Sequence, residues 1–379
     1  MSAIVKPLQL RDRRLWRDFD WTLLLAALAL TSLGVIEIFS SQPESDFWVK
    51  QLIWLSLGTV AMFVTMLFDY RRIYNYIPYI YAVGIVMLVA VLLFGKVVNG
   101  QRNWINLGSF SLQPSEFVKI AVILALARFL SPIRKGDLPF KDIVIAGAIT
   151  ALPVGLIMLQ PDAGTAMTFF PIVIALLFLS GLNLRIVIIS VLAALLLIPT
   201  GYYFARKYQI LKPYQIMRVE AILHPELFEQ PEFRRQYGYQ TMQSIIAVGS
   251  GGVTGTGITK GTQSRLGFLP EHHSDFIASV LAEETGFIGS IFALTLYLFI
   301  IIHAIGTAER ARDRFGMLMI LGFISLFSFH VIINVGMVVG LVPILGITLP
   351  LMSYGGSSIL STMMALGLVM NVKLRRFVN

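Results

Sequence analysis

The strongest constraint on this chain is a series of apolar segments, each about 20 residues long and separated from the next by a polar connection. A helix of that length spans the hydrocarbon layer of a bilayer, so each segment is typical of a transmembrane helix. The sequence therefore predicts an all-α polytopic membrane protein with about ten transmembrane helices, in which residues 1–379 form a single integral membrane domain. The predicted spans are residues 21–40, 48–68, 76–94, 114–131, 142–159, 163–181, 185–204, 274–302, 316–340 and 351–371.

Composition supports the membrane assignment. Hydrophobic residues make up 56% of the 379 residues and charged residues only 13%, and the mean hydropathy of +0.76 lies outside the range of soluble domains. The apolar segment at 21–39 follows an Arg-rich start and resembles a signal peptide, but the many later spans favour an uncleaved first helix. The lack of cysteine excludes disulfides, thiolate nucleophiles and Cys-based metal sites.

The basic residues predict the orientation. More than half of the 30 Lys and Arg residues fall in the termini and in every second connection, whereas the short connections on the other side carry only Lys50, Lys96 and Arg102. This is the positive-inside pattern, and it predicts that both termini are cytoplasmic, with residues 1–20 as a cytoplasmic tail. The net charge of +9 thus follows from topology, and because it is not gathered on one face, no nucleic acid is expected as a partner.

Three extracytoplasmic or membrane-inserted segments differ from plain connections. Residues 95–113 are rich in Asn, Gly and Ser and predict an interfacial loop. A large extracytoplasmic loop at about 206–273, between helices seven and eight, is long enough to be functional. Its glycine-rich run at 249–264 matches neither standard phosphate-binding pattern, but it suits a loop that bends sharply against other backbone or a lipid head group. Residues 340–358 contain several glycines and two prolines, which predict an irregular re-entrant stretch before the last helix.

Polar residues gather at the outer helix ends, and this convergence predicts a shared site. Glu116 and Lys119 lie three residues apart on one helix face, where they could form a neutralising ion pair or the wall of a polar cavity. Asp162 stands before a new helix, where a helix N-cap is the favoured interpretation. His330 is interpreted as a buried hydrogen-bonding group.

Asp275 is the best-placed candidate for catalysis. With no cysteine and no Ser/His/Asp pattern, a carboxylate acting as general base is the most economical catalytic group. The competing interpretation is that Ser274 or Asp275 only caps the helix that follows. His272 and His273 could join Asp275 in a divalent metal site, but the sequence HHSD at 272–275 matches no specific metal motif.

Four stretches, residues 101–130, 160–165, 238–289 and 334–358, together resemble the SEDS family of bacterial cell-wall synthases, and within it the branch that acts in cell elongation. The resemblance extends from the first predicted helix to the last. The chain differs at Ser274, where a Thr is usual, and at Thr256 and Ile258 in the glycine-rich run, and none of these differences removes a charged group.

The resemblance implies a peptidoglycan glycosyltransferase, multi-pass in the bacterial cytoplasmic (inner) membrane, that polymerises lipid II into glycan strands at the outer face. The family's catalytic aspartate falls on Asp275, which would take the proton from the acceptor sugar's 4-hydroxyl in an inverting displacement. A pyrophosphate leaving group requires cations, for which a divalent ion (Mg²⁺ or Mn²⁺) is a candidate, and no organic cofactor is expected. The other candidate substrate-binding residues are Arg102, Glu116, Lys119, Asp162, Arg218, Lys260, Arg265 and Ser357, with Asp162 also a candidate metal ligand.

The partners implied are lipid II, the growing glycan strand, a class B penicillin-binding protein, other elongation-complex proteins and membrane lipids. The alternative function is a flippase for a lipid-linked cell-wall precursor, because intramembrane charges and broken helices also suit transport. A transporter needs a polar path to both faces, however, whereas these charges gather at the outer helix ends. A scaffold would leave Glu116, Lys119 and Asp275 without a role. Glu283 and Glu284, further along their helix, are assigned to helix packing and cavity lining.

Overall fold

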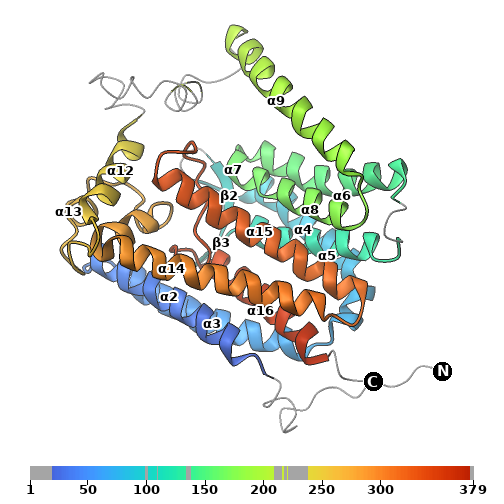
Figure 1. Ribbon diagram of the computed structural model, residues 1–379, viewed down its shortest axis with the longest axis horizontal. Helices are drawn as coiled ribbons and strands as arrows, with labels where there is room; N and C mark the ends of the chain where they lie inside the picture. Colours follow the sequence, from blue (N-terminus) through green and yellow to red (C-terminus); the bar gives the residue numbers. More distant parts are fainter. Residues whose placement is uncertain are drawn as a thin grey trace.

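The computed structural model describes residues 19–98, 101–108, 110–133, 138–208, 216, 220 and 238–375. Most of the long helices lie side by side in one bundle, and each predicted span coincides with one long helix or with a pair (Figure 1). They are α2 (Trp21–Ser41), α3 (Phe47–Leu67), α4 (Tyr70–Phe94), α5 (Pro114–Leu130), α6 (Phe140–Leu159), the pair α7 (Ala163–Met167) and α8 (Phe169–Leu179), α9 (Leu184–Lys207), α14 (Ile277–Glu309), α15 (Arg314–Val338) and α16 (Gly356–Arg375).

Seven of these helices are long and apolar enough to cross a membrane, counted over the described residues: α2, α3, α4, α6, α14, α15 and α16. The prediction of an all-α polytopic membrane protein is confirmed, while the number of ten spans stays a prediction. Asp20, the N-cap of α2, lies 2.8 Å through Oδ2 from Lys373 Nζ near the end of α16. The start of α2 and the end of α16 therefore lie at the same end of the bundle. Two termini on the same side of the membrane require this arrangement.

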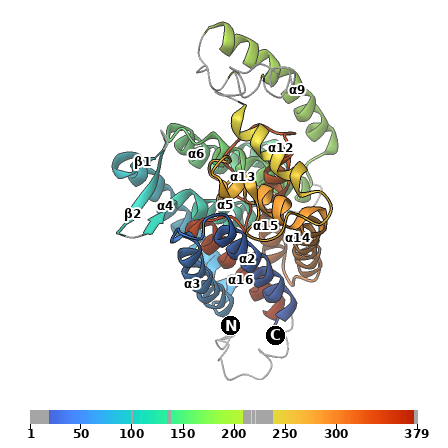
Figure 2. The ribbon, with the colours of Figure 1, turned by 90° about the vertical axis from the view of Figure 1, so that its left-hand side faces the viewer.

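The last two spans form the centre of the bundle. Of the most apolar 18-residue stretch of each helix, 83% of the residues are buried in α16 and 61% in α15, compared with 17% in α3. α16 packs against α3 and α5, and α15 packs against α5, α8 and α14. α9, by contrast, leads away from the bundle (Figures 1 and 2).

The segment predicted as an interfacial loop at 95–113 contains a small antiparallel sheet, which corrects that prediction. Its strands are β1 (Lys96–Val98), β2 (Gln101–Leu107) and β3 (Phe110–Leu112), in the order β1-β2-β3. Ile105 pairs with Leu112, and Gly108, at a φ of +68°, lies in the turn between β2 and β3. The strands are only three to seven residues long, so the sequence pattern typical of a strand is short. The Asn, Gly and Ser content of the segment therefore favoured a loop over a sheet in the prediction. The sheet contacts α4, α5 and α16.

α14 is broken at Gly286, whose φ of +67° and ψ of −160° are not helical. The glycine-rich run after α12 (Tyr239–Gly251) forms hydrogen bonds with the backbone groups that the break leaves without helical partners. Its amides at Thr256 and Gly257 donate to the carbonyls of Glu283 and Glu284 over 2.9 and 3.0 Å. In return, the amides of Phe287 and Ile288 donate to the carbonyls of Gly252 and Val253 over 3.0 and 3.2 Å. Backbone groups freed by a kink inside a membrane need such partners.

This backbone-to-backbone packing explains the glycines. A Cβ on Gly255 would lie 2.1 Å from Glu284 O, and a Cβ on Gly286 would lie 2.3 Å from Gly255 N. The sharply bent loop packed against other backbone, one of the two uses predicted for the run at 249–264, is therefore confirmed.

The last irregular stretch also agrees with its prediction. Residues 341–355 have neither helix nor strand, and α16 begins at Gly356, five residues after the predicted position. The shift has a tertiary cause that hydropathy does not register, because Ser353 and Tyr354 bond to the chain just before α14: Ser353 Oγ donates to Ser274 O over 2.6 Å, and Tyr354 N donates to His273 O over 2.8 Å.

Candidate functional site

The centre of the site is a buried ion pair on α5. Lys119 Nζ lies 2.8 Å from Glu116 Oε1, and the two residues are only 2% and 8% exposed. Pro114 at the first position of α5 sets the start of this helix, so Glu116 and Lys119 follow on one face, one turn apart. Ser361 on α16 donates to Glu116 Oε2 over 3.3 Å. Two charges buried among apolar helices require this pairing.

The pair also lines a small cavity of about 20 Å³, enough for roughly one water molecule. Both interpretations left open by the sequence, the ion pair and the cavity wall, are therefore confirmed. The cavity is lined further by Ile120, Phe323, Leu326, Phe327, His330, Pro350, Ser358, Ser361, Thr362 and Ala365.

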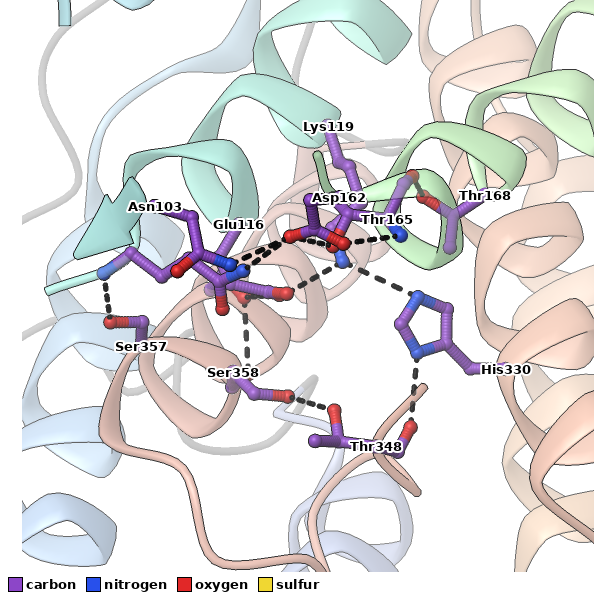
Figure 3. Close-up of polar contacts among 12 residues, drawn as sticks. Asn103, Glu116, Lys119, Asp162, Thr165, Thr168, His330, Thr348, Ser357 and Ser358 are labelled. Atoms are coloured by element: carbon purple, nitrogen blue, oxygen red, sulfur yellow. Dashed lines mark hydrogen bonds and ion pairs between the residues drawn. The ribbon is translucent and has the colours of Figure 1, made fainter. Parts of the chain in front are cut away.

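His330 on α15 extends the network (Figure 3). Its Nε2 lies 3.3 Å from Lys119 Nζ, and its Nδ1 lies 3.1 Å from Thr348 O. Because a carbonyl oxygen only accepts, Nδ1 carries the proton and Nε2 accepts from Lys119. The interpretation of His330 as a buried hydrogen-bonding group is confirmed. An ammonium has three N–H groups, and Glu116 and His330 take two of them.

Asp275 lies in the turn before α14 and is half-buried. The helix begins at Ile277 with Phe276 at its N-cap position, so Ser274 and Asp275 lie just before the cap, and the interpretation of either as the cap stays a prediction. The carboxylate faces the irregular stretch, where a Cβ on Gly346 would lie 3.6 Å from Asp275 Oδ2.

Neighbouring elements hold the backbone around Asp275 on both sides. Asn334, one turn beyond His330 on α15, donates from Nδ2 to Asp275 O over 2.9 Å and to Ile347 O over 2.7 Å. The two bonds from Ser353 and Tyr354 hold the preceding residues. α15 thus carries the residues that contact both Lys119 and the chain at Asp275.

His272 and His273 both pack against neighbouring groups of the protein. Burial lowers the pKa of both imidazoles. The ring of His273 stacks on Phe47 at a centroid distance of 4.5 Å, and His272 Nδ1 lies 2.7 Å from Leu269 O. No group of three or more His, Asp or Glu residues that could hold a metal occurs among the described residues. The described His, Asp and Glu side chains around His272 and His273 therefore do not fit a metal site made by the protein alone.

Asp162 is the N-cap of α7, as the favoured interpretation predicted. Its Oδ1 accepts from Thr165 N over 3.1 Å, and its Oδ2 accepts from Thr165 Oγ1, Asn103 Nδ2 and Gln113 Nε2 over 2.9, 2.8 and 3.3 Å. With these four donors the carboxylate is occupied by the protein itself, so the geometry gives no support to a metal or a sugar at Asp162 (Figure 3). Ser357 joins this cluster, since its Oγ accepts from Gln113 N over 2.9 Å.

The other predicted cations are exposed on the protein surface or lie outside the described residues. Arg102 is exposed on β2, where Nη1 donates to Leu92 O over 3.1 Å. Lys260 is exposed in the glycine-rich run, and exposed Arg265 donates to Thr259 O over 2.6 Å. None of the described contacts joins these three to Lys119. Arg218 lies outside the described residues.

Glu283 and Glu284 are buried and bind the outer loop to the bundle. Glu283 Oε1 accepts from Thr262 N and Gln263 N over 2.6 and 2.8 Å, at the start of the short helix α13 (Thr262–Arg265). Glu284 accepts from Ser40 Oγ on α2 over 2.6 Å. Their predicted helix packing is confirmed by the bond to Ser40 on α2, with residues 262–263 as further partners, while their predicted cavity lining stays a prediction.

Sequence reasoning missed Ser361, Asn103 and Gln113. Ser361 follows Ser357 and Ser358 at helical spacing, which was the available signal. Asn103 gave none, because its position depends on a sheet that was not predicted.

The chain is similar to proteins of known class along nearly its whole length. A family model described as cell cycle protein, which groups FtsW, RodA and SpoVE, matches residues 14–377. The peptidoglycan glycosyltransferase RodA of Treponema pallidum is 36% identical over 95% of this chain and 98% of its own. The peptidoglycan glycosyltransferase MrdB of Escherichia coli K12 is 38% identical over 94% of both chains.

Two solved structures have the same fold. One is a chain of a peptidoglycan synthase complex that coordinates polymerisation and crosslinking, 32% identical, with a TM-score of 0.80 over 95% of this chain and 99% of that one. The other is the rod shape determining protein RodA of Thermus thermophilus, 28% identical, with a TM-score of 0.71 over 96% of this chain and 99% of that one. The latter was also solved as an aspartate-to-alanine mutant.

Proposed function

Because this chain belongs to the cell cycle protein family of FtsW, RodA and SpoVE, and is a peptidoglycan glycosyltransferase of the bacterial inner membrane, we propose that Asp275 is the general base of its reaction. The SEDS resemblance predicted from the sequence is this family. The activity of the relatives decides between a synthase and the flippase considered as the alternative.

The observation that carries the proposal is the way in which the chain around Asp275 is held. Its carbonyl oxygen and those of the two preceding residues accept hydrogen bonds from Asn334, Ser353 and Tyr354, on α15 and in the irregular stretch. A base acts efficiently only when its carboxylate is held at a fixed position relative to the reacting hydroxyl. The half-buried turn before α14 supplies such a position.

In the proposed step, Asp275 takes the proton of the acceptor sugar's 4-hydroxyl as that oxygen attacks the anomeric carbon of the donor. The bond between this carbon and the pyrophosphate oxygen breaks with its electron pair leaving on the pyrophosphate, and the anomeric configuration inverts. We take lipid II as the substrate and the outer leaflet as its location, because positive-inside charges put the opposite end of the bundle in the cytoplasm.

Lys119 is our candidate for neutralising the charge that develops on the leaving group. Its Nζ is fixed by Glu116 and His330, and the third N–H remains to be given to an anion. A cation fixed in advance in an apolar site stabilises developing negative charge more strongly than one in water. The divalent cation stays a prediction, and we propose no step through it, since the described residues do not form a protein-ligated metal site.

We also propose a class B penicillin-binding protein as partner, together with other proteins of the elongation complex. The support is the similar chain found in a synthase complex that coordinates polymerisation with crosslinking, two activities that a glycosyltransferase alone does not combine.

The test is glycan synthesis from lipid II by the purified chain with its penicillin-binding partner, followed on gels. Asp275→Ala should lower the rate at least about a hundredfold, the usual contribution of a general base. Asp46→Ala is the matched control, because Asp46 is an exposed aspartate next to α3 that makes no side-chain cap bond. The proposal fails if Asp275→Ala unfolds at the parental temperature and still polymerises at the parental rate.

A further inference from the structure

A second cavity opens at the end of the bundle opposite the ion pair of Glu116 and Lys119. It has a volume of about 490 Å³ and lies between the connections that join α3 to α4, α5 to α6, and α14 to α15. Its lining consists of Arg71, Tyr74, Ser131, Pro132, Arg312, Asp313, Arg314 and Phe315. None of these residues takes part in the proposed glycosyl transfer.

The lining is strongly basic, with three arginines and one aspartate. The aspartate is already engaged by the protein. Asp313 caps α15 by accepting from Gly316 N over 2.8 Å, it accepts from the hydroxyl of Tyr70, and its Oδ2 lies 3.6 Å from Arg71 Nε. The lining therefore carries more positive than negative side chains.

Two arginines bury N–H groups without acceptors among the described residues: Arg314, which lines the cavity, and Arg128, which does not line it but contacts the lining residue Tyr74. Arg314 donates from Nη1 to Ile133 O, but its Nη2 is buried and has no hydrogen-bond partner. Arg128 places its guanidinium 4.9 Å from the ring centroid of Tyr74 and buries an Nη1 that also has no partner. A buried guanidinium N–H without an acceptor is costly, so Arg314 in the lining favours an anionic acceptor at this place.

We propose that this cavity binds the phosphate group of an anionic phospholipid from the cytoplasmic leaflet. The positive-inside distribution puts these connections at the cytoplasmic surface, where basic pockets between helices bind anionic head groups. The planar guanidinium matches two phosphate oxygens at once. Tyr74, Pro132 and Phe315 provide apolar surface for the glycerol and the first methylene groups. A bound lipid would hold the ends of α4, α5 and α15 together.

The experiment measures the phospholipids that the full-length purified chain retains, by native mass spectrometry from micelles containing phosphatidylglycerol or phosphatidylcholine. The parent should retain phosphatidylglycerol selectively. Arg312→Gln should weaken that binding about tenfold, the usual effect of losing one hydrogen bond to a charged group. Pro132→Glu keeps every arginine and adds a carboxylate to the lining, and it should remove the selectivity.

Arg310→Gln is the matched control, because Arg310 is an exposed arginine of the same connection that does not line the cavity. It should retain phosphatidylglycerol like the parent. Equal losses in Arg310→Gln and Arg312→Gln would mean general surface attraction and would overturn the proposal. A second arm adds inorganic phosphate. If phosphate displaces the lipid at equal concentration and Arg312→Gln weakens both ligands equally, the cavity is a site for a small soluble anion and the lipid assignment is wrong.

Discussion

Asn334 binds the backbone of Asp275, with 2.9 Å between Nδ2 and the carbonyl oxygen, and with the same amide group it binds Ile347 O over 2.7 Å. It therefore joins the proposed base to the irregular stretch that passes in front of it. The side chain is fully buried, so neither carbonyl would gain water if the amide were removed.

Asn334→Ala should lower kcat about tenfold and change KM little, because the change loosens the position of Asp275 without removing a group that binds lipid II. Asn334→Asp should do the same, since a carboxylate cannot donate to the two carbonyls. Ser325→Ala is the control on α15, as among the described residues Ser325 bonds to Gly322 O of its own helix. A rise in KM at constant kcat would assign Asn334 to substrate binding and contradict the positioning role.

The pair of Glu116 and Lys119 allows the structural and functional roles of the lysine to be separated. Lys119→Met leaves a buried carboxylate without its counter-ion, which should destabilise the fold by about 3–5 kcal/mol. Adding Glu116→Gln removes that charge and should restore most of the unfolding temperature. Polymerisation at limiting lipid II should stay low in the double variant. If the double variant recovers its turnover together with its stability, Lys119 is only a structural counter-ion.

The two histidines before α14 predict a pH dependence of stability. Burial lowers the pKa of His272 and His273 below the ordinary value of 6.5, so the unfolded chain binds protons that the folded chain does not. Their contribution to the free energy of unfolding should therefore be fully present above about pH 7 and should decrease as the pH falls through 6.5. Thermal unfolding of the parent and of His272→Asn/His273→Phe between about pH 8 and about pH 5.5 measures this contribution. If the unfolding temperature falls equally in both proteins as the pH is lowered, the pH dependence belongs to other groups.

Asp162 gives a prediction about the outer sheet. Its four hydrogen bonds join α7 to Asn103 and Gln113, so Asp162→Ala should destabilise the protein by about 2 kcal/mol or more through the loss of the cap and of the buried bonds. Asp162→Asn retains one carbonyl acceptor and should lose less. Polymerisation per folded molecule should change little in either variant. A much larger loss of activity than of folded protein would return Asp162 to the substrate-binding set.

The sequence predicted features that depend on local or periodic patterns. Hydropathy identified the spans, Pro114 marked the start of α5, and the spacing of Glu116 and Lys119 predicted their contact. Features that depend on distant partners were not predictable in this way. Asn103 and Ser361 reach the site only through tertiary packing. Asp275 was a candidate base from its position before a membrane helix and from the family resemblance, but its surroundings were not predicted, because they are formed by α15 and the irregular stretch, far away in sequence.

The break in α14 gives the last prediction. Gly286→Ala demands a positive φ from a residue with a side chain, and its Cβ would lie 2.3 Å from Gly255 N, so the glycine-rich run must move away from α14. The amides of Phe287 and Ile288 would then lose the carbonyls of Gly252 and Val253. Gly306→Ala is the control on the same helix, because a Cβ there meets nothing within 4 Å and should stabilise the helix by about 0.5–1 kcal/mol. Gly286→Ala should lower the unfolding temperature and expose the run at 252–261 to proteolysis. Unchanged protease resistance at those residues would show that the run is held by other contacts.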